Sequence, residues 1–268
     1  MSIHLNRRQF VTATIAATAL LESGSSIGAV PVSEEKRRIF ACGSGILSPP
    51  NALLIQYVLD LTGKKDPVVC LLPTAVGDNS GFIQFWYEVM NDLPCRPRHL
   101  RLFGNSFRMK SFEAQLMAAD VIFVGPGSTL NMLAIWKAQE VDAILRKAWE
   151  AGIVMAGESA GYICWFEQGV TDSRPEHLTS VQGLGFLKGS GCPHYDNERE
   201  RKPSYHKMLA SGEVKDGYAC EDSVGLLFEG EQLTHVVAGR PGKTAYRVQY
   251  DGRAVSEQPL AAQLLQKK

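Results

Sequence analysis

A single serine stands between small residues where an apolar strand turns into a helix. The apolar run from Gly152 to Ala156 is typical of a buried strand, and Gly157-Glu-Ser-Ala-Gly161 follows it directly. The apolar residues 162–166 predict the first turns of a buried helix. Such a sharp turn forces its central residue to a positive φ, and the flanking glycines leave room for the neighbouring backbone. The pattern predicts a nucleophile elbow that exposes the Ser159 hydroxyl above a helix N-terminus; the alternative is a helix N-cap.

Composition limits the chain to a large globular domain, or to two that are tightly joined. It has 268 residues, of which 45% are hydrophobic and 21% charged, and its formal net charge is zero. Because the charge is balanced, no basic stripe is available to displace counterions, and we expect no nucleic-acid partner. No apolar run reaches the roughly 18 residues that a membrane span needs, so we expect no span in the mature protein.

The first 32 residues differ in kind from the rest. Asn6-Arg7-Arg8-Gln9-Phe10 precedes a mildly apolar stretch, Val11 to Leu21, which is rich in Ala and Thr. This pattern resembles a twin-arginine export signal, and it predicts a periplasmic or secreted protein. The alternative is a disordered or helical extension of a cytoplasmic protein. Either way, residues 1–32 are set apart from a catalytic domain that we expect at 36–268.

The cysteines indicate neither a metal site nor a disulfide framework. The chain has six, none of which forms a C-x-x-C pair: Cys42, Cys70, Cys95, Cys164, Cys192 and Cys220. No Cys/His spacing suits zinc, so we expect neither a metal nor another cofactor. Cys42 and Cys70 lie within strand-like apolar runs, which favours buried free thiols over disulfides.

Strands and helices alternate through the first half of the chain. Strands are predicted at 39–43, 68–72, 98–102, 121–124 and 154–156, and helices at 51–61, 82–90, 111–118 and 130–146. Short apolar strands separated by helices indicate an α/β fold with a mostly parallel sheet covered on both faces. Ligands bind beyond the carboxyl ends of such strands. After Gly169 we expect loops, then strands at 225–228, 233–237 and 245–250, and a peripheral helix or frayed tail at 260–268.

A serine nucleophile needs a base within hydrogen-bond reach and a group that orients the base. Of the six histidines, two are candidates. His194 follows a turn-like glycine-rich segment, whereas His235 lies inside a predicted strand. His235 with an acid near residue 222 would follow the Ser–acid–His order of α/β-hydrolase esterases. Because a histidine within a strand is more often a half-buried structural residue, the pattern favours His194.

Five motifs in order carry a family resemblance. They are Cys42-Gly-Ser-Gly45, Leu72-Pro-Thr-Ala75, Gly125-Pro-Gly-Ser-Thr129, Gly157-Glu-Ser-Ala-Gly161 and Pro193-His194-Tyr195. From Ile39 to about Tyr250 the chain resembles the serine peptidases that include aspartyl dipeptidase (peptidase E) and cyanophycinase. The resemblance implies a three-layer α/β sandwich akin to class I glutamine amidotransferases, in which a cysteine takes the elbow position.

The resemblance also implies roles for individual residues. Ser159 corresponds to the nucleophile and His194 to the base. The triad acid falls just before a strand, in Ala219-Cys-Glu-Asp-Ser-Val-Gly225, where Asp222 is the better match and Glu221 the rival. The backbone N–H groups of Gly127 and Ala160 correspond to the oxyanion hole, because developing negative charge needs donors that are already in place.

Two residues depart from the family pattern. Glu158 stands where a neutral residue is usual before the serine, and Pro126 interrupts the glycine-rich loop. A carboxylate here would either raise the pKa of the base or turn away into a salt bridge. Proline has no N–H, so Pro126 cannot donate to an oxyanion. These departures keep a catalytically silent binding protein on the same scaffold as an alternative.

Basic residues after His194 predict the substrate class. Arg199 and Arg201 lie in Asp196-Asn-Glu-Arg-Glu-Arg-Lys202, and guanidinium groups suit carboxylates. In the family, residues at this place help to hold an acidic group of the substrate. We therefore expect a small peptide substrate, with a preference for aspartyl residues, bound by a monomer or a homodimer. Asp172 matches a further polar position and is expected near the site.

Overall fold

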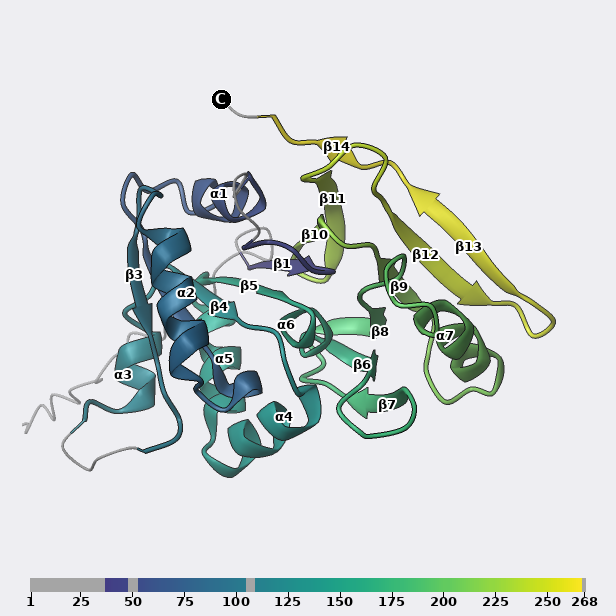
Figure 1. The fold of residues 1–268 in the computed structure, drawn as a ribbon, viewed down its shortest axis with the longest axis horizontal. Helices are drawn as coiled ribbons and strands as arrows, with labels where there is room; N and C mark the ends of the chain where they lie inside the picture. The colour runs from purple at the N-terminus through teal and green to yellow at the C-terminus, as the bar shows by residue number, and fades with distance from the viewer. Residues whose placement is uncertain (1–36, 48–52, 105–108, 267–268) are drawn as a thin grey trace, which may run out of the picture. The chain divides into compact units, whose positions relative to one another are not determined.

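The structure, a computed structural model, describes residues 37–47, 53–104 and 109–266. The expected export signal lies outside these ranges. Two mixed sheets carry the described fold (Figure 1). The first has the order β14-β11-β10-β1-β5-β4-β2-β3. Its strands are β1 (Arg38–Cys42), β2 (Val68–Leu72), β3 (Arg96–His99), β4 (Val121–Val124), β5 (Val154–Glu158), β10 (Val224–Glu229), β11 (Gln232–Ala238) and β14 (Gln263–Leu264).

The first sheet is parallel where helices connect its strands. β1, β5, β4, β2 and β3 are parallel neighbours in that order, whereas β10 and β11 extend the sheet with antiparallel pairs. The connecting helices are α1 (Leu53–Asp60), α2 (Ser80–Met90), α3 (Phe112–Leu116), α4 (Thr129–Ala138) and α5 (Val141–Glu150), with a 3-10 turn η2 (Thr74–Val76) after β2. The mostly parallel sheet predicted from the sequence is confirmed.

Alternate residues of each central strand enter different cores. Ile39 and Ala41 of β1 pack into the core that contains α4 and α5, whereas Phe40 and Cys42 pack into the core that contains α1 and α2. Both faces of the sheet are therefore covered, which gives three layers and explains why β2 and β4 are apolar throughout and β1 is apolar after Arg38. Figure 1 shows α1 and α2 on one side of the first sheet and the second sheet on the other.

The second sheet contributes to the third layer. Its order is β13-β12-β9-β8-β6-β7. The strands are β6 (Phe166–Thr171), β7 (Thr179–Gln182), β8 (Leu187–Cys192), β9 (Gly217–Cys220), β12 (Ala245–Tyr250) and β13 (Val255–Leu260), and the remaining helices are α6 (Ala160–Ile163) and α7 (Arg201–Ala210). Phe166, Leu187 and Cys220 of this sheet join the same core as α4 and α5.

Several sequence-based boundaries are wrong. The helix predicted over 130–146 is two helices, because Glu140 adopts a φ of 59° and ends the first. The helix after the elbow has only four residues, since the chain enters β6 at Phe166. Loops predicted after Gly169 contain β7, β8, α7 and β9, and the segment 260–268, predicted as a peripheral helix or a frayed tail, contains the short strand β14. Of these elements, β8 and β9 pair with strands that lie far along the chain, and local periodicity does not predict such pairing.

All six cysteines are free, and five of them are buried, which agrees with the expectation of buried thiols. No helix within the described ranges is both long enough and apolar enough to cross a membrane.

Candidate active site

Ser159 occupies a strained turn between β5 and α6. Its φ is 55° and its ψ −107°, and its side chain makes no helix-capping hydrogen bond. A Cβ atom added at Gly157 would lie 2.5 Å from the carbonyl oxygen of Gly161, and one added at Gly161 would lie 2.2 Å from that of Val124. No side chain fits at either position. The backbone therefore has the elbow geometry that the sequence predicts, and although Ser159 stands at the N-cap position of α6, its side chain does not cap the helix.

His194 links the Ser159 hydroxyl to a carboxylate. Its Nε2 lies 2.9 Å from Ser159 Oγ, and its Nδ1 lies 3.0 Å from Asp222 Oδ1. His194 follows β8 and has a positive φ of 54°, whereas Asp222 lies in the turn between β9 and β10. Three segments that are distant in the chain thus meet in one row of hydrogen bonds.

The charge on Asp222 assigns the protons along this row. Burial alone would raise the pKa of Asp222, but hydrogen bonds from His194 and Asn197 and the nearby charge of Lys243 hold the pKa below its usual value. An ionised carboxylate only accepts hydrogen bonds, so His194 Nδ1 must carry a proton. In a neutral imidazole Nε2 is then the acceptor, and the Ser159 hydroxyl donates to it. This is the arrangement in which a serine can lose its proton to histidine.

Two residues that the sequence analysis did not single out hold Asp222 in place. Asn197 Nδ2 donates to Asp222 Oδ2 at 2.9 Å, and the backbone N–H of Asp222 donates to Asp196 Oδ1 at 2.9 Å. Both lie in the polar stretch after His194, which the sequence analysis treats as a charged substrate-binding segment. Only the short spacing from His194 could have drawn attention to them.

The rival acid and the rival base make other contacts. Glu221 accepts hydrogen bonds from the Tyr246 hydroxyl at 2.9 Å and from the Thr244 backbone at 3.1 Å. His235 is an exposed residue of β11, and its Nδ1 lies 3.1 Å from the Thr234 hydroxyl. Among the described residues, neither side chain is hydrogen-bonded to Ser159 or His194. The geometry favours Asp222 over Glu221 and His194 over His235.

The predicted oxyanion donors lie at one edge of the sheet. Gly127 is in the loop after β4, and Ala160 begins α6 after the neighbouring parallel strand β5. Gly127 has a φ of 126°, and a Cβ atom there would lie 2.4 Å from the Ala75 carbonyl oxygen. No acceptor for the Gly127 N–H occurs among the described residues, and the N–H of a first helical residue has no intrahelical partner. Their role in binding an oxyanion remains a prediction.

The two arginines predicted to bind substrate differ in exposure. Arg201 is 1% exposed, and its guanidinium donates to Glu198 Oε2 at 2.8 and 2.5 Å and to the Val170 carbonyl at 2.9 Å. It also lies 4.0 Å from Asp172, whose side chain is mostly exposed. Arg201 therefore ties α7 to β6 and faces away from solvent, which departs from the expected substrate contact. Arg199 is exposed.

Glu158 is a buried carboxylic acid beside the nucleophile. Its Oε2 accepts a hydrogen bond from the Ile46 backbone at 3.0 Å, and within the described ranges it has no ion pair. The side chain thus holds the segment after β1 against the elbow, and it does not turn away into the salt bridge that was one of the two sequence-based expectations. Burial raises the pKa of Glu158 to about 7, although hydrogen bonds from Ile46 and Gly45 act in the opposite direction.

We expect Glu158→Gln to remove a pH dependence of stability. Because the folded-state pKa of about 7 exceeds the ordinary glutamate pKa of 4.5, wild-type stability falls as the pH rises between these values. At 1.36 kcal/mol per pKa unit, the variant should gain roughly 2–3 kcal/mol in free energy of unfolding relative to wild type between pH 5 and pH 8. Urea unfolding at both pH values measures this, with the exposed Glu88→Gln as control. Parallel pH curves for wild type and Glu158→Gln would contradict it.

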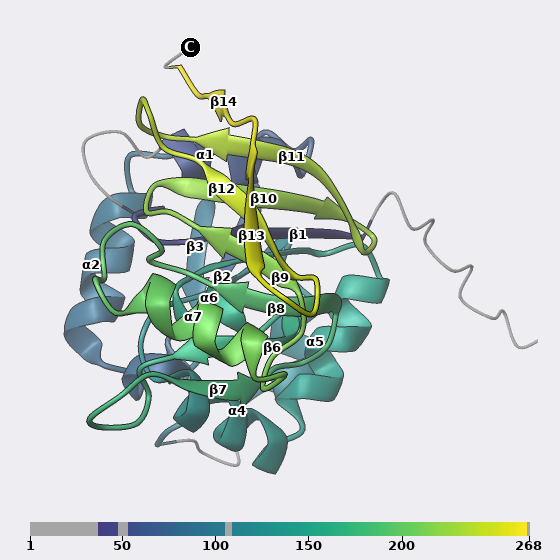
Figure 2. The same cartoon turned by 90° about the vertical axis from the view of Figure 1, so that its right-hand side faces the viewer.

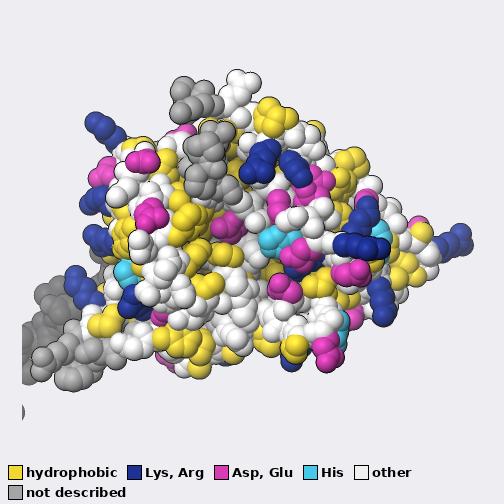
Figure 3. Space-filling view, in the orientation of Figure 1, with side chains coloured by type: hydrophobic (Ala, Val, Ile, Leu, Met, Phe, Trp, Pro, Cys, Tyr) yellow, Lys and Arg dark blue, Asp and Glu magenta, His cyan; other side chains and the backbone are white. Residues whose placement is uncertain are grey.

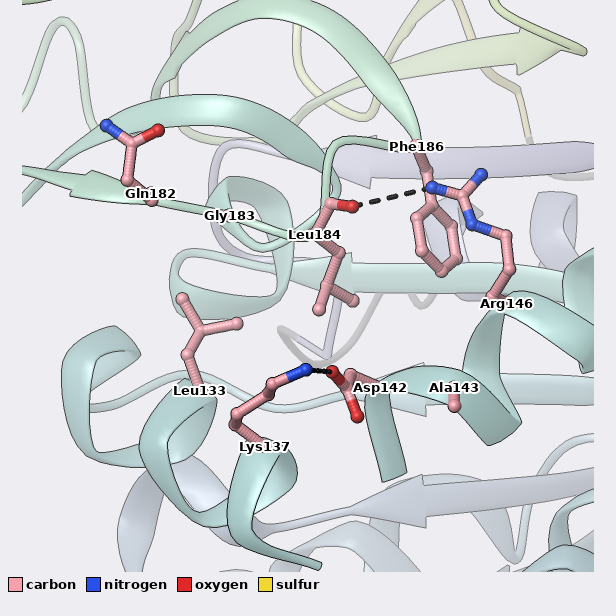
Figure 4. A pocket seen from close by; sticks show the side chains of 9 residues that line it. All are labelled: Leu133, Lys137, Asp142, Ala143, Arg146, Gln182, Gly183, Leu184 and Phe186. Carbon is pink, nitrogen blue, oxygen red and sulfur yellow. Dashed lines mark hydrogen bonds and ion pairs between the residues drawn. The ribbon is translucent and has the colours of Figure 1, made fainter. Parts of the chain in front are cut away.

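A separate cavity of about 460 Å³ lies away from the Ser159–His194–Asp222 row (Figure 4). It is lined by residues of α4, α5 and the segment from β7 to β8, and none of the three belongs to its lining. One wall is closed by Arg146, whose guanidinium lies 3.8 Å from the centroid of the Phe186 ring and donates to the carbonyls of Leu184 and Gly185. This hollow is therefore not part of the candidate active site.

Comparison with known proteins identifies the family. The family model described as Peptidase family S51 matches residues 39–236, which include Ser159, His194 and Asp222. The chain belongs to peptidase family S51. This S51 peptidase is a serine-type enzyme. Family membership, together with the exposed position of His235, argues against the α/β-hydrolase esterase alternative.

Relatives extend over most of the S51 peptidase. It is 45% identical over 232 residues to an uncharacterized peptidase, YgaJ, of Bacillus subtilis (strain 168), which covers 85% of this chain and 99% of the relative. A peptidase from an acI-B1 actinobacterium has a TM-score of 0.64 at 18% identity, covering 84% of this chain and 94% of that one. A putative peptidase E from Listeria monocytogenes EGD-e has a TM-score of 0.54 at 18% identity, covering 75% and 98%. The two structures support the three-layer fold.

Proposed function

We propose that this S51 peptidase hydrolyses peptide bonds through a Ser159–His194–Asp222 triad. The observation that carries the proposal is the row of hydrogen bonds at 2.9 and 3.0 Å through both imidazole nitrogens. Ser159 Oγ attacks the peptide carbonyl while His194 Nε2 takes its proton, and the same proton passes to the leaving amine. Asp222 stabilises the imidazolium that forms. Water then repeats the sequence on the acyl-enzyme and releases the acid product.

In this proposal, the N–H groups of Gly127 and Ala160 bind the oxyanion of the tetrahedral intermediate. Both residues lie at the carboxyl edge of the sheet, where Ser159 is half-buried. Donors that are in place before the reaction need no reorganisation, and losing one such donor typically costs about 10²–10³ in turnover. The absence of an N–H at Pro126 leaves Gly127 as the donor of this loop.

We further propose a small peptide substrate with an aspartyl residue near the cleaved bond, as in a dipeptidase or a cyanophycinase-like enzyme. The support is the exposed Arg199, five residues after His194 and next to the triad segment. Arg201 contributes indirectly, because its buried guanidinium fixes the start of α7. An exposed guanidinium can bind a carboxylate with two parallel hydrogen bonds.

A peptide screen tests this function. Short peptides that differ in their first residue are incubated with wild type, Ser159→Ala and Arg199→Ala. We expect cleavage by wild type, none by Ser159→Ala, and a raised KM for aspartyl peptides alone with Arg199→Ala. An unchanged preference in Arg199→Ala would reject the role of Arg199 and leave the triad standing. Failure of wild type to react with a fluorophosphonate probe would instead favour the silent binding protein.

Asp222→Asn is expected to lower turnover by roughly 10² to 10⁴ with little change in KM. The amide keeps the shape but cannot stabilise the imidazolium, and it favours the wrong tautomer of His194. Steady-state kinetics on a responsive peptide measures the loss. Glu221→Gln is the comparison, and its loss in turnover should be clearly smaller, because Glu221 bonds to Tyr246 and Thr244 and has no hydrogen bond to His194 among the described residues. If Glu221→Gln proved the more damaging of the two, Glu221 would be the triad acid.

A further inference from the structure

A C-terminal hairpin lies beside the residues that carry the triad. We use the term C-terminal hairpin for residues 243–260, which comprise Lys243, Thr244, β12 and β13. β12 pairs with β9 in the second sheet, and both hairpin strands contact α7 (Figures 1 and 2). The family match ends at residue 236, so the hairpin lies beyond it. His194 and Asp222 are in the loops that join β8 to α7 and β9 to β10, next to these same elements.

The residue after His194 is bound to the hairpin. Tyr195 is buried, and its hydroxyl donates to Glu257 Oε1 of β13 at 2.7 Å. Glu257 is itself held by Lys202 at 2.7 Å and by His206 at 2.6 Å, both on α7. Because His194 has a positive φ, its backbone is strained and stays in place only where neighbouring contacts over-determine it. The bond from Tyr195 to Glu257 is such a contact.

The residue before Asp222 is bound to the hairpin as well. Tyr246 of β12 donates its hydroxyl to Glu221 Oε1 at 2.9 Å, and the Thr244 N–H donates to Glu221 Oε2 at 3.1 Å. The Glu221 N–H in turn donates to the Thr244 carbonyl at 3.3 Å. The backbone on the N-terminal side of Asp222 is therefore fastened through both main chain and side chain.

A third contact joins the two triad segments to each other through the hairpin. Lys243 forms an ion pair with Asp196, whose other oxygen accepts the N–H of Asp222 at 2.9 Å. The bond to Asp196 raises the pKa of Lys243, so the ammonium stays charged. Figure 3 shows acidic and basic side chains interspersed over this end of the molecule, as such pairing requires. Asp196 is thus fixed by the hairpin while it fixes Asp222.

We propose that the C-terminal hairpin is a positioning element that sets the His194–Asp222 geometry through Lys243, Tyr246 and Glu257. This inference rests on the proposed function. None of these three side chains is hydrogen-bonded to Ser159 or His194 among the described residues. They act through Asp196, Glu221 and Tyr195, each next to a triad residue or bonded to one. A misplacement of about 1 Å in a catalytic group can cost roughly 10² in rate, so small displacements of these loops matter.

Three chemically identical changes test the proposal. Tyr195→Phe removes the hydroxyl that donates to Glu257 of the hairpin. Tyr246→Phe removes the hairpin hydroxyl that donates to Glu221. Tyr250→Phe, on the same β12 strand, is the matched control, because its hydroxyl has no hydrogen bond among the described residues. Three quantities are measured: the low-field proton resonance of the His194 Nδ1–H, the rate of fluorophosphonate attachment to Ser159, and the thermal unfolding midpoint.

We expect the double variant Tyr195→Phe/Tyr246→Phe to react roughly 10²-fold more slowly and to show a shifted or broadened resonance. The control should keep both. If the folded double variant retained the wild-type resonance and rate, and only its unfolding midpoint fell, the hairpin would be merely structural and the proposal would be overturned. If wild type itself failed to react at Ser159, the proposed function would fail. In that case, a His194 resonance that is present in wild type and lost in the double variant would still support the positioning role of the hairpin.

Discussion

Ser159→Ala is expected to abolish peptide hydrolysis, with a loss on the order of 10⁶ in turnover. The variant removes the atom that would bond to the substrate carbonyl, and no neighbouring group in the row of hydrogen bonds can replace it. Alanine meets the same backbone strain as serine at a φ of 55°, so the fold should be little affected. Turnover on a responsive peptide and the thermal unfolding midpoint are measured on the same preparation, and the midpoint should stay nearly unchanged.

Labelling by a fluorophosphonate gives an independent measure of the same prediction. Wild type should be labelled at Ser159 and Ser159→Ala should not be labelled. Ser256→Ala, a change of an exposed serine on β13, is the control and should keep both labelling and turnover. Activity of Ser159→Ala within tenfold of wild type would contradict the assignment of the nucleophile.

His194→Ala should be as damaging as the serine change, because triad members act as a unit. Without the imidazole, Ser159 has no acceptor for its proton, and Asp222 loses the group that it orients. The double variant at 159 and 194 should be scarcely worse than either single variant, and turnover measurements on all three test this. An effect of the double variant equal to the product of the single effects would argue against a shared mechanism.

His235→Ala is the control for the base. His235 is exposed on β11 and bonds to its neighbour Thr234, so this variant should retain most activity. If His235→Ala were the inactive variant instead, His194 would not be the catalytic base.

The elbow and the parallel half of the first sheet were predictable from the sequence because short-range forces determine them. Gly157 and Gly161 are required by close backbone approaches within one turn and to the adjacent strand. The strands β2 and β4, and β1 after Arg38, are apolar on both faces, which is typical of a sheet with two covered sides. His194 could also be preferred over His235, because a loop histidine is freer to meet a nucleophile than one inside a strand.

Elements whose partners lie far along the chain were not predictable in the same way. β9 is short and has no strong alternation, and it is a strand because β8 and β12 bond to it. The break between α4 and α5 depends on the positive φ of Glu140, a residue type that otherwise favours helices. The strand β13 is largely exposed, so it lacks the apolar pattern from which a strand can be predicted.

The sequence by itself determined the elbow, the nucleophile candidate and the class of fold, since these follow from sterics and periodicity within a few residues. Only the tertiary structure favours Asp222 over Glu221, because these adjacent residues bond to different partners, His194 and Tyr246, which are more than 20 residues away in the chain. Only the tertiary structure shows that Arg201 is buried. Glu198 balances the charge of its guanidinium, and Glu198 and the Val170 carbonyl accept its hydrogen bonds. Burial and hydrogen bonding of a charged side chain depend on what the fold brings next to it.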